Sequence, residues 1–172
     1  LETWLTTRLG KSIVRAKDTP NFVANRVGVF SILAVLHHTA RLGLAFDEVD
    51  LLTGPRIGRP KSATFRTGDV VGLDTLAHVV GTMQATLPND PWHAHFSTPE
   101  WLQALIAKGA LGQKTKCGIY RKQGKQIQVL DLKLQDYRES GGEVFPEVDA
   151  ILKLKNPAEK FAQLAAHPHP QA

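Results

Sequence analysis

The sequence contains only one cysteine and one methionine among its 172 residues. A single cysteine excludes a disulfide within the chain and a cluster of thiolate metal ligands. No apolar run approaches the roughly 20 residues needed to cross a bilayer, and no secretory signal pattern is present. A Gly-x-Gly-x-x-Gly sequence between a strand and a helix, typical of dinucleotide-binding folds, is also missing. The chain is therefore expected to be cytoplasmic and to carry no dinucleotide site of its own.

The remaining composition is that of an ordinary folded domain. Hydrophobic residues make up 42% of the sequence and charged residues 22%, close to the averages for globular proteins. This length allows one domain with a proper core, or one domain with a tail. The sequence opens on Leu1 without an initiator methionine, and we expect it to be a piece of a longer polypeptide.

Positive charge is in excess, with a net charge of +5 and an isoelectric point near 9.5. Much of this charge gathers in one short segment, at Lys108, Lys114, Lys116, Arg121, Lys122 and Lys125. Such a patch can meet the phosphates of DNA, of RNA or of a nucleotide cofactor such as coenzyme A, or it can be a solvated hairpin face. Because no stacking aromatics or nucleic-acid motif accompany the patch, binding to nucleic acid is the less favoured interpretation.

Hydrophobic spacing and turn residues predict a mainly α-helical fold with one small β-hairpin. Asp18 or Thr19 is expected to cap a long helix whose residues 27–36 are apolar nearly all round, which places that stretch at the centre of the core. A tight turn is expected at Gln123-Gly124. The predicted helices cover residues 1–9, 20–42, 46–52, 62–65, 72–87, 98–108, 146–154 and 157–166. Residues 11–16 form a candidate strand, and 118–122 and 125–130 form the hairpin.

Three stretches carry chemistry-bearing residues. The first places an Asn-Arg pair, Asn25 and Arg26, in the first turns of the apolar helix, where an amide without a partner costs about 1–3 kcal/mol. The second is Thr53-Gly-Pro-Arg-Ile-Gly-Arg-Pro-Lys-Ser, leading into Gly68-Asp-Val-Val-Gly-Leu-Asp, and the third is Gly112-Gln-Lys-Thr-Lys-Cys-Gly-Ile-Tyr. In this order and spacing the three resemble the C-terminal helical domain of the 3-hydroxyacyl-CoA dehydrogenases. The second stretch looks most like the multifunctional fatty-acid-oxidation members.

The resemblance implies a fold like the C-terminal domain of the 6-phosphogluconate and 3-hydroxyacyl-CoA dehydrogenases. It implies an acyl-CoA substrate, and NAD bound by a nucleotide-binding half that also supplies a catalytic histidine and glutamate. In the family the asparagine matching Asn25 faces the substrate and has a supporting catalytic role. Gly58 and Pro60 match positions that shape the acyl end of the substrate pocket. The resemblance also implies that the domain serves in a homodimer and is inactive alone.

The same resemblance divides the chain into three parts. Residues 1–19 are expected to be the end of the nucleotide-binding half and a linker. Residues 20–138 are expected to form the helical domain, and 139–172 a connector or the start of a following region. Some residues depart from the family pattern. Arg59 and Lys61 replace smaller or apolar residues, which leaves the acyl-chain preference open, and Lys116 stands where glycine is common.

Other constellations are weaker. His37 and His38 point about 100° apart on a helix and cannot both ligate one ion well. His93 and His95 lie in a loop without a third ligand at familiar spacing, so no metal site is predicted. Two rivals to the dehydrogenase interpretation remain, namely a helical oligomerisation or binding module without catalytic residues, and a basic nucleic-acid binder.

Overall fold

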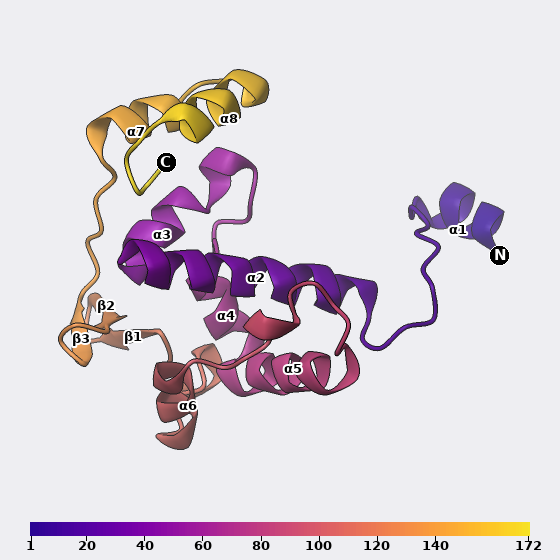
Figure 1. The fold of residues 1–172 in the computed structure, drawn as a ribbon, viewed down its shortest axis with the longest axis horizontal. Coiled ribbons are helices and arrows are strands. Elements are labelled where there is room, and N and C mark those ends of the chain that lie inside the picture. The colour runs from indigo at the N-terminus through magenta and orange to yellow at the C-terminus, as the bar shows by residue number, and fades with distance from the viewer.

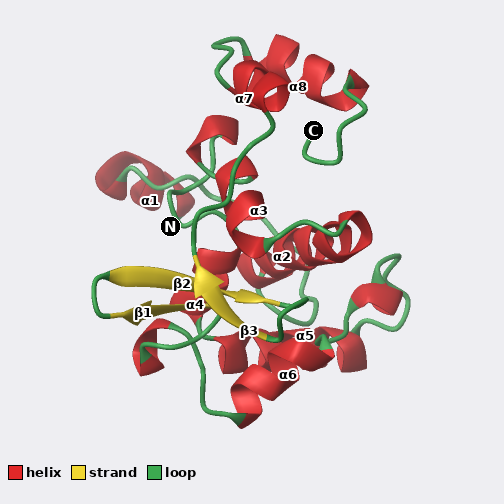
Figure 2. Cartoon of the chain, turned by 90° about the vertical axis from the view of Figure 1, so that its left-hand side faces the viewer, coloured by secondary structure: helices red, strands yellow, loops and turns green.

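The computed structural model of the chain describes residues 1–172 and contains eight α-helices and one three-stranded sheet (Figures 1 and 2). The predicted mainly helical fold is confirmed. The helices are α1 Glu2–Leu9, α2 Val23–Leu42, α3 Phe46–Leu52, α4 Phe65–Val71, α5 Leu73–Thr86, α6 Glu100–Ala107, α7 Pro146–Leu152 and α8 Pro157–Ala166, and the strands are β1 Tyr120–Gln123, β2 Gln126–Asp131 and β3 Asp136–Glu139. No helix has both the length and the apolar character that crossing a bilayer would require.

Helix α2 runs through the middle of the molecule and packs on α5 (Figure 1). It begins at Val23, so the predicted start at residue 20 with a cap from Asp18 or Thr19 is wrong. The backbone of Asn21 has φ +66°, which is not helical, and the chain turns into the helix only after this residue. The predicted end near residue 42 is confirmed, because Gly43 adopts the left-handed conformation that closes many helices.

The apolar stretch of α2 is not buried all round, contrary to the sequence prediction. Val29, Leu33 and Leu36 point into the core. On another side of the helix Val27 keeps 64% of its surface exposed, and Phe30 keeps 38%. Helix α2 therefore has one face in the core and leaves other apolar side chains partly exposed.

Helices α4, α5 and α6 complete the main core. The core residues Phe65, Leu73, Met83 and Leu102 are almost fully buried here. Helix α4 begins at Phe65 and not three residues earlier, as predicted, because its first turn is capped from elsewhere in the chain. The carboxylate of Asp50 accepts hydrogen bonds from the backbone N–H groups of Thr64, Phe65 and Arg66, at 3.0, 2.7 and 3.1 Å. These donors have no partner within the helix itself.

The predicted hairpin is present but belongs to a three-stranded antiparallel meander (Figure 2). Gln123 pairs with Gln126, so the turn residues are Gly124 and Lys125, one position later than predicted. Strand β3 was not predicted. It pairs along β2, and its Arg138 holds the buried Asp47 of α3 through two hydrogen bonds of 2.7 and 2.8 Å.

The two ends of the chain differ in how they are held. The predicted helices α7 and α8 enclose a small second core of Val148, Leu152 and Leu164. At the other end α1 lies apart from the remaining helices (Figure 1) and has no buried residue. The candidate strand 11–16 forms no strand, and its residues are exposed.

Candidate functional site

Asn25 lies in the first turn of α2, where its side chain is half-buried. Its amide forms no hydrogen bond within the chain. The neighbouring Arg26 is engaged: its guanidinium donates to Thr19 and forms an ion pair with Asp90 at 3.2 Å. The two members of the Asn-Arg pair therefore differ, because Arg26 ties the start of α2 to two loops while the amide of Asn25 is left free.

The second stretch forms a loop that is tied to α2. Gly58 and Pro60 are both exposed, and Gly58 has φ +81°, a conformation that suits glycine. Between them the guanidinium of Arg59 donates to the hydroxyl of Ser31 on α2 and to that of Thr64, the latter at 3.3 Å. Ser31 follows Asn25 by six residues, about 9 Å along the helix axis. Arg59 thus fixes this loop to the helix that carries Asn25.

The third stretch is held by a buried polar network that sequence reasoning did not find. The carboxylate of Asp69, in α4, accepts the N–H groups of Ile119 and Tyr120, both at 2.8 Å. The hydroxyl of Tyr120 donates to Asp50 at 2.9 Å. Burial raises the pKa of Asp69 to about 6 and also raises the pKa of Asp50. Hydrogen bonds from backbone N–H groups act in the opposite direction on both pKa values but do not outweigh burial. The sequence signal for this network is weak, because Asp50 and Asp69 lie in short helices that also carry other polar residues.

Gly112 and Gly118 make room for the network. A Cβ atom on Gly118 would lie 2.9 Å from Cγ of Asp69 and 2.6 Å from Cα of Gly112, too close for real atoms. Between these glycines Lys116 adopts φ +58°. This left-handed conformation, at a position where the family commonly has glycine, costs a non-glycine residue about 1–2 kcal/mol.

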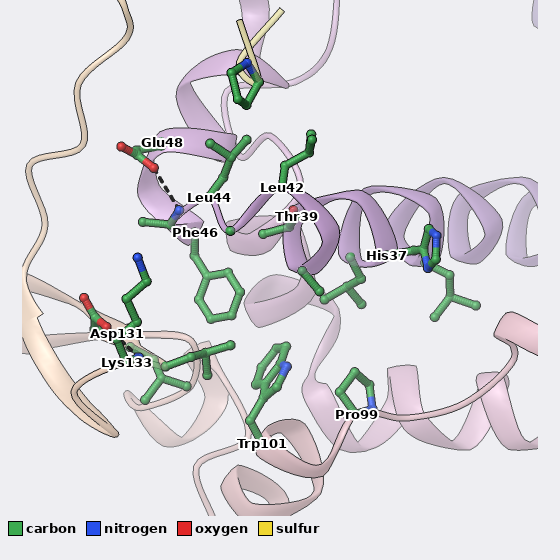
Figure 3. A pocket seen from close by; sticks show the side chains of 18 of the residues that line it. His37, Thr39, Leu42, Leu44, Phe46, Glu48, Pro99, Trp101, Asp131 and Lys133 are labelled. Carbon is green, nitrogen blue, oxygen red and sulfur yellow. Dashed lines mark hydrogen bonds between the residues drawn. The ribbon is translucent and has the colours of Figure 1, made fainter.

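A cavity of about 960 Å³ lies at the other end of α2 (Figure 3). Its wall is formed by the C-terminal half of α2, the start of α3, the segment leading into α6, the β2–β3 turn and residues 169–171. Neither Asn25 nor the exposed pair Gly58 and Pro60 contributes to it. Sequence reasoning missed this cavity, because its wall joins five segments that lie far apart along the chain.

Histidines gather beside the cavity without forming a metal cluster. The rings of His37 and His95 lie 4.5 Å apart between centroids, and those of His37 and His38 lie 5.3 Å apart. Burial lowers the pKa of His38, as do the charges of Arg41 and of the other two histidines. No group of three or more His, Cys, Asp or Glu side chains is arranged to hold a metal ion.

Comparison with known proteins assigns the chain to a family. The family description "3-hydroxyacyl-CoA dehydrogenase, C-terminal domain" matches residues 22–122. Two solved structures share the fold. FadB2 of Mycobacterium tuberculosis is 29% identical with a TM-score of 0.59, over 71% of this chain and 41% of its own. The (S)-3-hydroxybutyryl-CoA dehydrogenase PaaH1 of Ralstonia eutropha is 25% identical with a TM-score of 0.58, over 69% of this chain and 40% of its own.

Curated relatives are similar over most of this chain but are themselves much longer. A Bacillus subtilis protein named as a probable 3-hydroxyacyl-CoA dehydrogenase is 42% identical over 156 residues, which are 91% of this chain and 20% of the relative. A Rickettsia prowazekii protein, named for a fatty acid oxidation complex trifunctional enzyme, is 31% identical over 72% of this chain and 18% of its own length. This chain thus spans about a fifth of these relatives. It belongs to the family of 3-hydroxyacyl-CoA dehydrogenase C-terminal domains.

Proposed function

We propose that this domain forms the substrate-side wall of an NAD-dependent 3-hydroxyacyl-CoA dehydrogenase of fatty-acid β-oxidation, with Asn25 facing the acyl-CoA substrate. The observation that carries the proposal is the half-buried amide of Asn25 without a hydrogen-bond partner, on a helix whose other polar side chains near this end are engaged. A purely structural asparagine would be expected to be buried and bonded to backbone groups. A neutral amide can donate to or accept from a substrate oxygen or a catalytic histidine without changing charge.

The rest of the reaction belongs to other parts of the enzyme. Oxidation of a hydroxyl group needs a base for the proton and a nicotinamide for the hydride. The proposed roles of this chain are to position the substrate through Asn25 and to shape the acyl end with the loop at Gly58 and Pro60. NAD, the catalytic histidine and the glutamate are assigned to a nucleotide-binding half. The chain alone is therefore expected to oxidise no NADH when it is mixed with acetoacetyl-CoA.

The test replaces Asn25 by alanine in a full-length enzyme that carries this domain. Losing one positioned hydrogen-bond donor lowers kcat about 10- to 1,000-fold, and the melting temperature should change little, because the amide has no partner to lose. Arg26→Ala is the matched control. It removes the contacts to Thr19 and Asp90, so it should lower the melting temperature and leave kcat near the parent value. A destabilised but fully active Asn25→Ala enzyme would refute the role of this residue.

A second role, self-association, is favoured by the outer face of α2. Val23, Val27, Phe30 and Ala34 recur every three or four residues and lie roughly opposite Asn25 at about 100° per residue. This stripe therefore does not belong to the wall that carries Asn25. It holds no charge, so two copies can meet across a two-fold axis without repulsion. Sedimentation of the chain should show a dimer that Val27→Glu dissociates, whereas Val14→Glu, at an exposed valine outside the helix, leaves it intact.

A further inference from the structure

The cavity at the C-terminal end of α2 has an apolar floor. Leu33 and Leu36 of α2, Phe46 of α3, Trp101 of α6 and Leu130 of β2 line it. The rings of Phe46 and Trp101 lie 4.9 Å apart between centroids. In Figure 3 the two rings lie side by side among the side chains that line the cavity. A volume of about 960 Å³ is at the upper end of the range for small-molecule sites.

The charged groups on the rim are not equally available to a ligand. Glu48 already accepts the N–H of Ala45 at 2.8 Å. Asp131 accepts the N–H groups of Lys133 and Leu134 and is paired with a guanidinium of β3 at 3.0 Å. The ammonium group of Lys133 makes no hydrogen bond or ion pair, although the side chain lines the cavity. Asp131 is therefore paired within the protein, Glu48 is held by one backbone N–H and keeps its charge, and the ammonium group of Lys133 is the charged hydrogen-bond donor without a partner.

The far side of the cavity is lined by neutral or weakly basic groups. His37 and His95 stand there, and Figure 3 shows His37 and Lys133 on opposite sides of the Phe46–Trp101 pair. No carboxylate lines that side of the cavity. The geometry thus offers one end with an unpaired ammonium group, an aromatic and aliphatic middle, and a far end without negative charge.

We infer that this cavity binds an alkyl chain that ends in an anionic group, with the anion on Lys133 and the alkyl chain across Phe46, Trp101 and Leu36. Each buried CH₂ group favours binding by removing apolar surface from water. A charge-assisted hydrogen bond to an ammonium with no other partner fixes the orientation of the ligand. Leu36 follows Asn25 by eleven residues, about 16 Å along the helix. The site is thus separate from the proposed substrate wall and does not depend on it.

The experiment titrates the 172-residue chain with decanoate by calorimetry, and in parallel with decanol and decanoyl-CoA. Saturable one-to-one binding of decanoate is expected, with decanol weaker because it lacks the anion. The comparison with decanoyl-CoA identifies which kind of molecule supplies the alkyl chain. Tighter binding of decanoate than of decanoyl-CoA points to a free carboxylic acid, and the reverse order points to an acyl thioester with its phosphates as the anion.

Two variants locate the site. Ala40→Trp adds bulk to the cavity wall from an exposed position of α2 and should abolish binding. Lys133→Met should lower the affinity for decanoate about tenfold, as loss of one charge-assisted hydrogen bond does. The affinity for decanol should change less than twofold. The matched controls are Ala85→Trp, at an exposed position of α5, and Lys125→Met, in the β1–β2 turn, neither of which lines the cavity.

Circular dichroism melting curves establish that each variant folds. If Ala40→Trp does not fold, Ala94→Trp fills the same cavity from the segment before α6. The assignment is overturned if decanoate shows no saturable binding to the parent chain. It is also overturned if decanoate binds both cavity-filling variants as tightly as the parent chain. If Lys133→Met lowers the affinities for decanoate and for decanol equally, the placement of the anion on Lys133 is overturned.

Discussion

Gly118→Ala tests whether the contact between α4 and the start of β1 is as tight as the geometry indicates. The added Cβ would lie 2.9 Å from Cγ of Asp69 and 2.6 Å from Cα of Gly112. Gly112 has little room to move away, because it is packed tightly against the backbone of Asp69. A Cβ atom on Gly112 would itself lie 2.8 Å from Cα of Asp69. The Asp69 carboxylate must then move away from the N–H groups that it accepts.

The size of the effect follows from those two hydrogen bonds. Each joins a buried carboxylate to a backbone N–H at 2.8 Å, and a bond of this kind contributes about 1.5–3 kcal/mol. Loss of both predicts that Gly118→Ala lowers the free energy of unfolding by about 3–6 kcal/mol. This is a large fraction of the 5–15 kcal/mol typical of a domain.

Urea denaturation followed by circular dichroism measures the change. Gly141→Ala is the control, because a Cβ at this exposed loop glycine meets nothing within 4 Å, and it should stay within about 0.5 kcal/mol of the parent chain. A Gly118→Ala chain that unfolds within 1 kcal/mol of the control would show that the strand can shift away, and the reasoning on this contact would be refuted.

Three further changes test other parts of the structure by the same denaturation assay. Lys116→Gly should stabilise the chain by about 1 kcal/mol, because φ +58° strains lysine and suits glycine; a loss of stability would contradict this. Arg138→Met should destabilise by about 3–5 kcal/mol, because it leaves the buried carboxylate of Asp47 without its ion pair; Arg121→Met, also on the sheet, is its control. Folded Asp69 keeps its proton up to a pKa of about 6, compared with 3.8 unfolded, so its protonation stabilises the fold at low pH. The stability of the parent chain relative to Asp69→Asn should therefore fall by about 2 kcal/mol between pH 4 and pH 6, and a pH-independent difference would contradict the shift.

Sequence patterns located most of the helices because their signals are local. Residues 46–52 and 157–166 form the helices predicted there, and Gly72 opens α5 as expected. The errors came from long-range causes. Asp50 caps α4 from fourteen or more residues away, and no local pattern shows where that cap falls. Strand β3 reads Asp-Tyr-Arg-Glu, with little alternation, and is stabilised by pairing with β2 and by the contact of Arg138 with Asp47.

The candidate sites divide in the same way. Asn25 was found because a family resemblance pointed to it, while helical spacing alone left its structural and functional interpretations open. The cavity was missed because five separate segments build its wall. Lys133 in particular has no neighbour in sequence that marks it as a ligand-binding residue, since its availability depends on Asp131 being paired with other groups.

The three stretches that carry the family resemblance play different physical parts in the fold. In the third, Gly112 and Gly118 admit the buried carboxylate of Asp69, so packing alone accounts for both glycines. In the second, the guanidinium of Arg59 makes hydrogen bonds that hold a loop against α2. In the first, Arg26 is bonded within the chain, and the amide of Asn25 remains without a partner. A side-chain amide that lies half-buried without a partner in the chain stays open to water or to a group from outside the chain, whereas the same amide in a closed core would be costly. That difference supports the proposal that Asn25 faces the substrate.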